Sequence, residues 1–238
     1  SLHDLGQLKA AVESYKETLG IEPGYAEAHN NLGNVFQELE QANSAVQSYK
    51  RALEIKPDYV AAQYSLGNTF MELGQLDEAV KSYKAAIKLR PNFAGAYNNL
   101  GNAYQELKQG DAAIKSYKKA LEIKPDYVAA QYSLGIMFQD LGQFEAAIKC
   151  YEMVLAIKPD FEEAHNNLGV AFLNLNQFDE AVKSYKAAIK IKPDFVEAIN
   201  NLGIGFFNLS QMEDAIKSYE KAIAIQPDFV KAHNNLGN

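Results

Sequence analysis

Residues 60–93 read VAAQYSLGNTFMELGQLDEAVKSYKAAIKLRPNF, and close copies of this stretch recur along the chain at a spacing of 34 residues. Residues 52–67 and 120–135, for example, are identical to each other. The chain length of 238 is seven times 34, and all seven prolines keep the same spacing: Pro23, Pro57, Pro91, Pro125, Pro159, Pro193 and Pro227. A fixed period of this length is the signature of a repeat architecture, so the repeat decides the fold.

Counting repeat positions from Ala26 divides the chain into six whole repeats and two partial ones. The whole repeats are 26–59, 60–93, 94–127, 128–161, 162–195 and 196–229. Residues 1–25 supply the last 25 positions of a repeat, and residues 230–238 supply the first nine. We therefore expect a single repeat domain over residues 1–238.

Each repeat is predicted to form two helices. In the first whole repeat the first helix should cover about 26–39, and the second about 44–55. Position 15 of the repeat, which is Glu40 here, can end the first helix in a left-handed conformation. Position 18 is an acid in five whole repeats and Asn43 in the other, so it is expected to cap the second helix. The second helix should stop before the proline, because the residue preceding proline leaves the α region.

The apolar pattern resembles that of the tetratricopeptide repeat. Positions 7 and 8 are Leu-Gly in every copy, position 11 is aromatic in every whole repeat, and position 24 is always tyrosine. In the whole repeats position 20 is alanine, and position 27 is alanine except for Val154. The resemblance covers the whole chain and implies an all-α fold, a right-handed α-solenoid or superhelix of helix-turn-helix repeats. Small residues at positions 8 and 20 allow close approach of the two helices, and stability comes from stacking of neighbouring repeats.

Composition excludes several classes of protein. With 47% hydrophobic and 22% charged residues the chain can form a core, so it is not a disordered protein. The formal net charge is -7, which argues against nucleic acid or an anionic membrane as a partner. The single cysteine, Cys150, says little about the redox compartment. A cytoplasmic location is favoured.

The first helix has two faces when its residues are placed at 100° intervals. Positions 3, 4, 7, 8, 11 and 14 carry the signature residues and should be buried. Positions 2, 5, 6, 9, 12 and 13 lie on the opposite side and are expected to face solvent. In tetratricopeptide superhelices that face lines a concave groove, which is what the resemblance implies here.

Asparagine recurs on this expected groove face. It is a poor residue for a helix interior, but it offers both a donor and an acceptor to an extended peptide backbone. The asparagines at position 6 form a predicted ladder that is similar to the asparagine ladder in the repeat superhelix of O-GlcNAc transferase, which holds substrate peptides. This ladder comprises Asn31, Asn99, Asn167, Asn201 and Asn235. Asn34, Asn68 and Asn102 at position 9, with Tyr64 and Tyr132 at position 5, complete the polar part of the predicted peptide-binding site.

The recurring asparagines also allow a structural role or a purely historical origin. Their amides can bond to adjacent helices and stiffen the stack. Recent duplication can instead have copied them, since long stretches of different repeats are identical.

The character of the face changes along the chain. Position 13 is Glu38, Glu72, Glu106 and Asp140, and then Asn174 and Asn208. Apolar residues replace polar ones in the C-terminal half: Ile136, Val170, Leu173, Ile204 and Phe207. We therefore expect a protein or extended-peptide ligand that is neutral to basic and carries an apolar anchor.

The sequence contains no recognisable catalytic set. His29, His165 and His233 occur at position 4 of different repeats, so they lack metal-ligand spacing, and no glycine-rich phosphate loop is present. We expect no metal, no cofactor and no enzymatic activity in this chain. The lysines alternate with acids on the second helices, as is typical of a solvated outer face.

The predicted function is a protein–protein interaction scaffold that binds an extended peptide or protein segment. One alternative is the substrate-recognition arm of a larger enzyme, such as a glycosyltransferase, whose catalytic domain lies outside this chain. Another is a structural scaffold that stacks end to end through its split terminal repeats.

Overall fold

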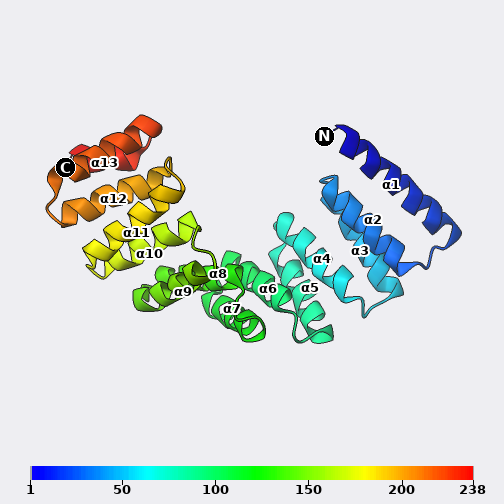
Figure 1. Cartoon of the computed structure of the whole chain (residues 1–238). Coiled ribbons are helices and arrows are strands. Elements are labelled where there is room, and N and C mark those ends of the chain that lie inside the picture. The colour runs from blue at the N-terminus through cyan, green and yellow to red at the C-terminus, as the bar shows by residue number, and fades with distance from the viewer. Residues whose placement is uncertain (1, 238) are drawn as a thin grey trace. The chain divides into compact units, whose positions relative to one another are not determined.

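The computed structural model describes the backbone of residues 2–237 and the side chains of residues 5–237, and this part of the chain contains only α-helices and the loops between them (Figure 1). The helices are α1 (Leu2–Ile21), α2 (Ala26–Glu38), α3 (Ala42–Ile55), α4 (Val60–Glu72), α5 (Leu76–Leu89), α6 (Ala94–Glu106), α7 (Gly110–Ile123), α8 (Val128–Asp140), α9 (Phe144–Ile157), α10 (Glu162–Asn174), α11 (Phe178–Ile191), α12 (Val196–Asn208), α13 (Met212–Ile225) and α14 (Val230–Gly237). The predicted all-α solenoid is confirmed. None of the helices in the described part combines the length and the apolar character needed to cross a membrane.

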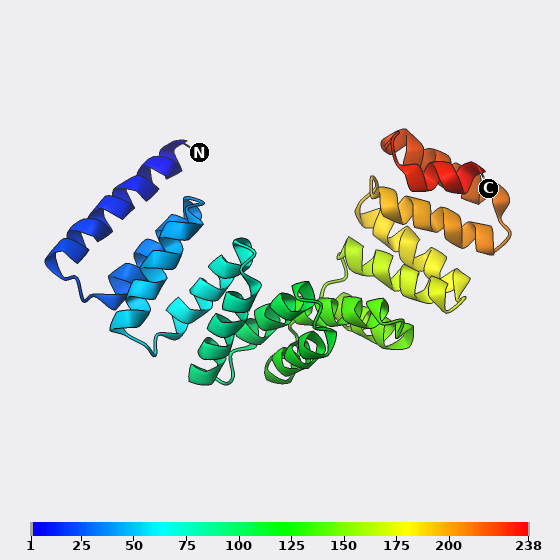
Figure 2. The same ribbon diagram turned by 180° about the vertical axis from the view of Figure 1, so that it is seen from behind.

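The chain consists of two compact units, residues 1–125 with α1–α7 (unit 1) and residues 126–238 with α8–α14 (unit 2). Within each unit every helix packs on the next one along the chain. The pairs α2–α3, α4–α5 and α6–α7 are the whole repeats of unit 1, and α8–α9, α10–α11 and α12–α13 are those of unit 2 (Figure 2).

Position 15 ends every first helix of a whole repeat, as predicted. Its φ is positive in all six: Glu40, Lys108 and Asn176 have φ 57°, Ser210 has 60°, Gly74 has 67° and Gly142 has 70°. The N–H of Glu40 donates to the carbonyl of Gln37 (2.9 Å), and the N–H of Gln41 donates to the carbonyl of Phe36 (2.8 Å). These two bonds form a Schellman motif, which satisfies the last carbonyls of the helix.

The predicted caps at position 18 are wrong. Each second helix begins at position 17, after a glutamine at position 16 such as Gln41, and no side chain makes a capping hydrogen bond at these starts. The tight Schellman turn places the helix start two residues earlier than the acids suggested. The acids therefore lie in the first turn, where they still favour the positive end of the helix dipole.

The partial repeat at the N-terminus forms one continuous helix. Gly6 occupies position 15, where the other repeats turn, yet α1 runs through it from Leu2 to Ile21. Continuing the helix satisfies the backbone hydrogen bonds instead.

The cores of both units are built from the signature residues. Tyr49, Tyr117, Tyr151 and Tyr185 at position 24 are completely buried. The alanines at positions 3 and 20 of the whole repeats are at most 2% exposed in both units. In unit 1 a cluster joins Tyr49 and Tyr83 with Leu66, Phe70 and Leu100, which come from three successive repeats. Neighbouring repeats thus share each core layer, so stacking stabilises the solenoid, as expected for repeat proteins.

Candidate functional site

The first helices form a row in each unit, with α2, α4 and α6 in contact in unit 1 and α8, α10, α12 and α14 in contact in unit 2. Each inner first helix is also covered by the second helix of its own repeat and by that of the preceding repeat. Only a narrow strip of the helix stays accessible. We call this strip the first-helix face and define it by repeat positions 2, 6, 9, 12 and 13.

Position 5 does not belong to this face, contrary to the sequence prediction. Asn30, Asn98 and Asn200 are at most 5% exposed, and Asn166 is also buried. A helical wheel allows for one packed side, whereas each first helix contacts other helices on several sides. Position 5 therefore faces the first helix of the next repeat.

Tyr64 and Tyr132, the position 5 residues of the predicted site, fill space between repeats. The ring of Tyr64 packs at centroid distances of 4.7 Å from Phe93 and 6.0 Å from Tyr83. Tyr132 repeats the arrangement in unit 2, at 4.8 Å from Phe161 and 5.9 Å from Tyr151. Burial raises the pKa of Tyr132 to about 12, so its hydroxyl stays protonated at neutral pH.

The asparagines at position 6 join successive repeats. Asn99 Nδ2 donates to the hydroxyl of Tyr64 and to Asn68 Oδ1, both at 2.9 Å. Asn167 Nδ2 donates to the hydroxyl of Tyr132 at 2.9 Å. Asn201 Nδ2 donates to Asn166 Oδ1 (3.1 Å), and Asn235 Nδ2 donates to Asn200 Oδ1 (3.0 Å). The ladder thus exists as a row of inter-helix hydrogen bonds, which favours the stiffening role for these amide N–H groups.

At position 9, the asparagine side chains contact the hydroxyl of the buried tyrosine at position 24 of the same repeat. The hydroxyl of Tyr49 donates to Asn34 Oδ1 (2.8 Å), that of Tyr83 to Asn68 Oδ1 (2.9 Å), and that of Tyr117 to Asn102 Oδ1 (2.8 Å). Tyr49 and Tyr117 also lie 2.9 Å from the side-chain oxygens of Gln37 and Gln105 at position 12. In all three repeats the amide oxygen at position 9 points inward.

Burial keeps these tyrosines in the donor form. It raises the pKa of Tyr49 to about 12, and it raises the pKa of Tyr83 further above the ordinary value. Both hydroxyls therefore carry their proton throughout the physiological range, and their contacts with the amides do not change with pH within it.

A small hollow opens on the first-helix face of unit 1. It has a volume of about 160 Å³ and is lined by Asn68, Met71, Tyr83, Asn99 and Asn102. The hollow brings together position 6 and position 9 asparagines of two successive repeats. A carbonyl or other small polar group fits a space of this size.

Carboxylates line one edge of the face in unit 1. Glu38, Glu72 and Glu106 at position 13 are all exposed. Glu72 accepts a hydrogen bond from Gln37 Nε2 of the preceding repeat, at 3.3 Å to each oxygen. Glu27 at position 2 forms an ion pair with Lys56, at 3.7 Å. The face therefore combines amides with a row of negative charge.

In unit 2 positions 9 and 12 of the same face are largely apolar. Ile136, Val170, Leu173 and Ile204 are half-buried, while Phe207 is 48% exposed. Asn174 and Asn208 are exposed, and their Nδ2 atoms donate to the carbonyls of Val170 and Ile204 on their own helices, at 2.8 Å. These apolar residues are flanked on the same face by polar ones at positions 2, 6 and 13, such as Glu163, Asn167 and Asp140.

The apolar strip leaves one tyrosine without a partner. The hydroxyl of Tyr185 is buried, and no described residue hydrogen-bonds to it. In its repeat the residues that could accept this bond are apolar, Val170 at position 9 and Leu173 at position 12. In the four preceding whole repeats an amide at one of these positions accepts from the tyrosine hydroxyl. In the last repeat Tyr219 is slightly less buried, at 4% exposed. Burial raises the pKa of Tyr185 well above the usual value.

The histidines at position 4 hold the loops between repeats. Nε2 of His29 lies 3.1 Å from the carbonyl oxygen of Pro23, and the equivalent distances are 2.9 Å for His165 and Pro159 and for His233 and Pro227. These side chains thus contact the preceding repeat rather than each other. Within the described residues, no group of three or more histidine, cysteine or acidic side chains could hold a metal ion.

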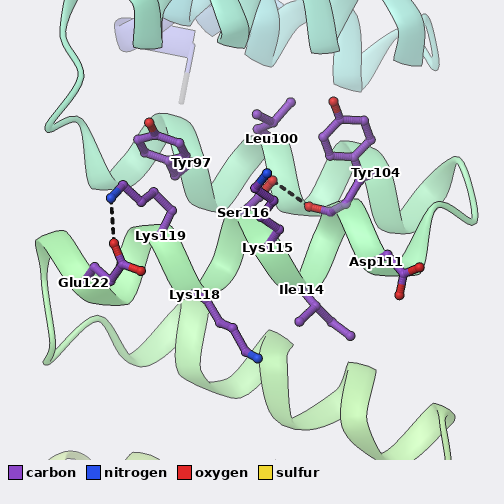
Figure 3. A pocket seen from close by; sticks show the side chains of 11 residues that line it. Tyr97, Leu100, Tyr104, Asp111, Ile114, Lys115, Ser116, Lys118, Lys119 and Glu122 are labelled. Atoms are coloured by element: carbon purple, nitrogen blue, oxygen red, sulfur yellow. Dashed lines mark hydrogen bonds and ion pairs between the residues drawn. The ribbon is translucent and has the colours of Figure 1, made fainter.

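A larger hollow lies away from the first-helix face. It has a volume of about 870 Å³ and is lined by residues of α6 and α7, including Tyr97, Leu100 and Lys115 (Figure 3). Lys119 and Glu122 form an ion pair of 2.6 Å at its edge. Its lining mixes both signs of charge with aliphatic groups, and it includes no unpaired buried polar group that would select a ligand.

Sequence reasoning missed the tyrosine hydroxyls, because position 24 was interpreted only as core. The ring is indeed core, but in three repeats its hydroxyl contacts the amide at position 9. The contact between positions 9 and 24 has a signal in the repeated sequence. Asparagine stands at position 9, fifteen residues before the tyrosine, in three successive repeats.

Comparison with known proteins agrees with this architecture. Profiles described as "TPR repeat" match residues 1–40, 38–74, 67–108 and 205–238, and profiles described as "Tetratricopeptide repeat" match residues 92–160 and 162–195. No curated protein matches the chain in sequence.

Several solved structures share the fold. The crystal structure of MamA is 31% identical, with 68% of this chain and 95% of that chain covered and a TM-score of 0.66. The C-terminal part of a TPR repeat-containing protein from Cytophaga hutchinsonii is 17% identical, with 99% and 96% covered and a TM-score of 0.81. YrrB, a TPR protein with an unusual peptide-binding site, is 20% identical, with 95% and 100% covered and a TM-score of 0.53.

The profile matches cover most of the chain, and the repeat positions they describe are those that build both cores. The chain belongs to the tetratricopeptide-repeat family.

Proposed function

We propose that this protein, an interaction scaffold of the tetratricopeptide type, binds an extended peptide or protein segment along its first-helix face. The observation that carries the proposal is the hollow of unit 1, where Asn68, Asn99 and Asn102 line a space of about 160 Å³ beside exposed carboxylates. A peptide backbone supplies the polar groups that such amides bind. The likeness to YrrB, which has an unusual peptide-binding site, supports the same proposal at the level of the fold.

The two units favour different parts of a ligand. In unit 1 the row Glu38, Glu72 and Glu106 attracts cationic side chains, and the formal net charge of -7 acts in the same direction. In unit 2 the strip that ends at Phe207 offers apolar contact area. The proposed ligand is neutral to basic and carries an apolar anchor.

Titration of the whole chain with blocked peptides tests this function. We choose peptides of about nine residues, long enough to span three repeats in extended form: three Ala-Ala-Lys triplets, three Ala-Ala-Glu triplets and three Ala-Leu-Ser triplets. The lysine peptide should perturb NMR signals of unit 1, and the leucine peptide those of unit 2. Phe207→Asn should weaken only the leucine peptide. Strongest binding by the glutamate peptide would overturn the proposed ligand chemistry.

End-to-end association of copies of the chain is a second candidate function. Ile216 of α13 is 45% exposed, whereas Val46, Val80 and Val182 at the same repeat position are at most 9% exposed. Covering this residue with a second copy would bury apolar area. Light scattering over a range of concentrations tests it: a mass that grows with concentration and falls back in Ile216→Lys supports association, and a constant monomer mass refutes it.

A further inference from the structure

The larger hollow of unit 1, away from the first-helix face, has an apolar part formed by α6. It has a volume of about 870 Å³, and Tyr97, Leu100 and Tyr104 project into it from one side of α6 (Figure 3). Leu100 is buried, whereas both tyrosines are half-buried and therefore partly accessible. We call these three residues the α6 stripe. Their spacing of i, i+3 and i+7 aligns them over two turns of the helix, about 10 Å.

Positive charge reaches the α6 stripe from both second helices that pack on α6. Lys115 and Lys119 of α7 line the hollow one turn apart, about 6 Å along the helix axis. Nζ of Lys84, on α5, lies 5.5 Å from the centroid of the Tyr104 ring. Lys119 pairs with Glu122, whereas Lys115 forms no ion pair with a described residue.

The lining of the hollow is basic although the chain is acidic. It includes the exposed lysines Lys115, Lys118 and Lys119 against two exposed acids, Asp111 and Glu122. The formal net charge of the whole chain is -7. This surface therefore favours an anionic ligand, in contrast to the acidic row of the first-helix face.

The combination of lysines and an apolar residue is particular to two repeats. Among the whole repeats, only 94–127 and 196–229 carry lysine at both positions 22 and 26, and only these two have a residue other than histidine or glutamine at position 4. The second of them, in unit 2, has an equivalent hollow of only about 190 Å³, which is lined at the same positions by Ile199, Leu202, Phe206, Lys217 and Lys221. It offers the same lysine pair with much less space, so it is a matched control for the hollow of unit 1.

We propose that the hollow of unit 1 docks an acidic amphipathic helix of a partner protein. Apolar side chains one turn apart on that helix pack on the α6 stripe, and its carboxylates pair with Lys84 on one side and with Lys115 and Lys119 on the other. No buried polar atom without a partner lines the hollow among the described residues. A helix suits such a surface because its backbone groups are already bonded to each other. This site is separate from the first-helix face and does not depend on the function proposed for it.

The probe is a blocked, fluorescently labelled peptide of two Glu-Leu-Ala-Ala-Leu-Glu-Ala units. In a helix its leucines form one stripe, and its glutamates flank that stripe on both sides. Two control peptides replace every Glu by Gln or every Leu by Ala. By fluorescence anisotropy, the acidic leucine peptide should bind the whole chain at least about fivefold more tightly than either control. Equal binding by either control, or no binding by the probe, would overturn the proposal.

Two double variants with the same change of net charge locate the site. Lys115→Glu with Lys119→Glu reverses the charge beside the hollow of unit 1, and Lys217→Glu with Lys221→Glu does the same in unit 2. At about 0.15 M salt the first should weaken the probe about 5- to 30-fold and the second less than about threefold. All four lysines are exposed, so both variants should fold, which circular dichroism checks. Equal losses would show a response to net charge alone and would overturn the site, as would no loss in the first variant.

Tyr97→Gln tests the apolar contact with a residue that the repeat accepts, since Gln63 and Gln131 occupy the same position in other repeats. It should weaken the probe about 3- to 10-fold, because the accessible part of the ring no longer packs on the leucines. Unchanged binding would contradict docking on the α6 stripe. Vesicles that contain phosphatidylserine are a competing ligand: if they bind more tightly than the probe and lose binding in the Lys115→Glu and Lys119→Glu variant, the surface is a membrane site and the partner helix is refuted.

Discussion

A methyl group on Gly33 would lie 2.6 Å from ring carbon Cε1 of Tyr49, a residue that is fully buried in the same repeat. The same relation holds in every whole repeat, with distances from 2.4 Å at Gly203 to 2.7 Å at Gly135. The glycine at position 8 therefore makes room for the tyrosine at position 24. The position of that ring also determines where its hydroxyl meets the first-helix face.

Gly101→Ala should destabilise the chain by about 1–3 kcal/mol, because the new Cβ would lie 2.5 Å from the buried ring of Tyr117. Gly20→Ala is the control. It removes a helical glycine with open space around it, and should stabilise by roughly 0.5–1 kcal/mol. Urea unfolding followed by circular dichroism measures both, and a neutral Gly101→Ala would contradict the packing argument.

Lys108→Gly should stabilise the chain by about 1 kcal/mol. Lys108 has φ 57° at the turn between α6 and α7, a left-handed conformation that costs a residue with a Cβ roughly 1–2 kcal/mol. Gly74→Ala at the equivalent turn should destabilise by a similar amount. Opposite signs for the two variants in the same unfolding assay support the prediction; equal signs do not.

Asn99→Ala should lower the free energy of unfolding by about 0.5–1.5 kcal/mol for each hydrogen bond lost, because Asn99 links α6 to two residues of α4. Asn31→Ala is the comparison, since among the described residues Asn31 makes only a long contact of 3.4 Å with Asn30. A melting temperature that falls in Asn99→Ala and stays constant in Asn31→Ala would establish a structural role for the ladder. Unchanged stability in both variants would show that the ladder has no structural role.

Tyr185→Phe should be neutral or stabilising, because it removes a buried hydroxyl that has no partner. Tyr49→Phe breaks the bond to Asn34 and should destabilise by about 0.5–1.5 kcal/mol. Differential scanning calorimetry of the two variants separates the cases. A Tyr185→Phe variant less stable than Tyr49→Phe would refute the assignment of partners.

Alkaline pH should unfold the chain. Burial raises the pKa of Tyr49 in the folded state to about 12, above the value of about 10 expected in the unfolded chain. The folded state then retains protons that the unfolded state loses. Stability is thus complete below pH 10 and falls as the pH rises through about 12. Tyrosinate absorbance and helical circular dichroism should change together over this range. Full ionisation near pH 10 with the helices intact would be the contrary result.

Much of the fold could be predicted from the residues because its determinants are local or recur with the period. The prolines and the leucine-glycine pairs locate the repeats, and the break at position 15 appears as a positive φ in every whole repeat. The amphipathic pattern also separated most buried positions from exposed ones. The apolar strip near Phe207 and the acidic row near Glu72 follow from composition at known positions.

The rest depends on neighbours that lie about one repeat away in sequence. Position 5 is buried because the next first helix covers it, which a single helical wheel cannot show. The amide of Asn99 finds its partners 31 and 35 residues away, at Asn68 and Tyr64. Which asparagines bond to the next first helix is therefore decided by tertiary packing. The sequence by itself determined the repeat, its helices and the residues available for a site; only the tertiary structure decided where each amide points, because hydrogen-bond direction depends on all the groups that surround it.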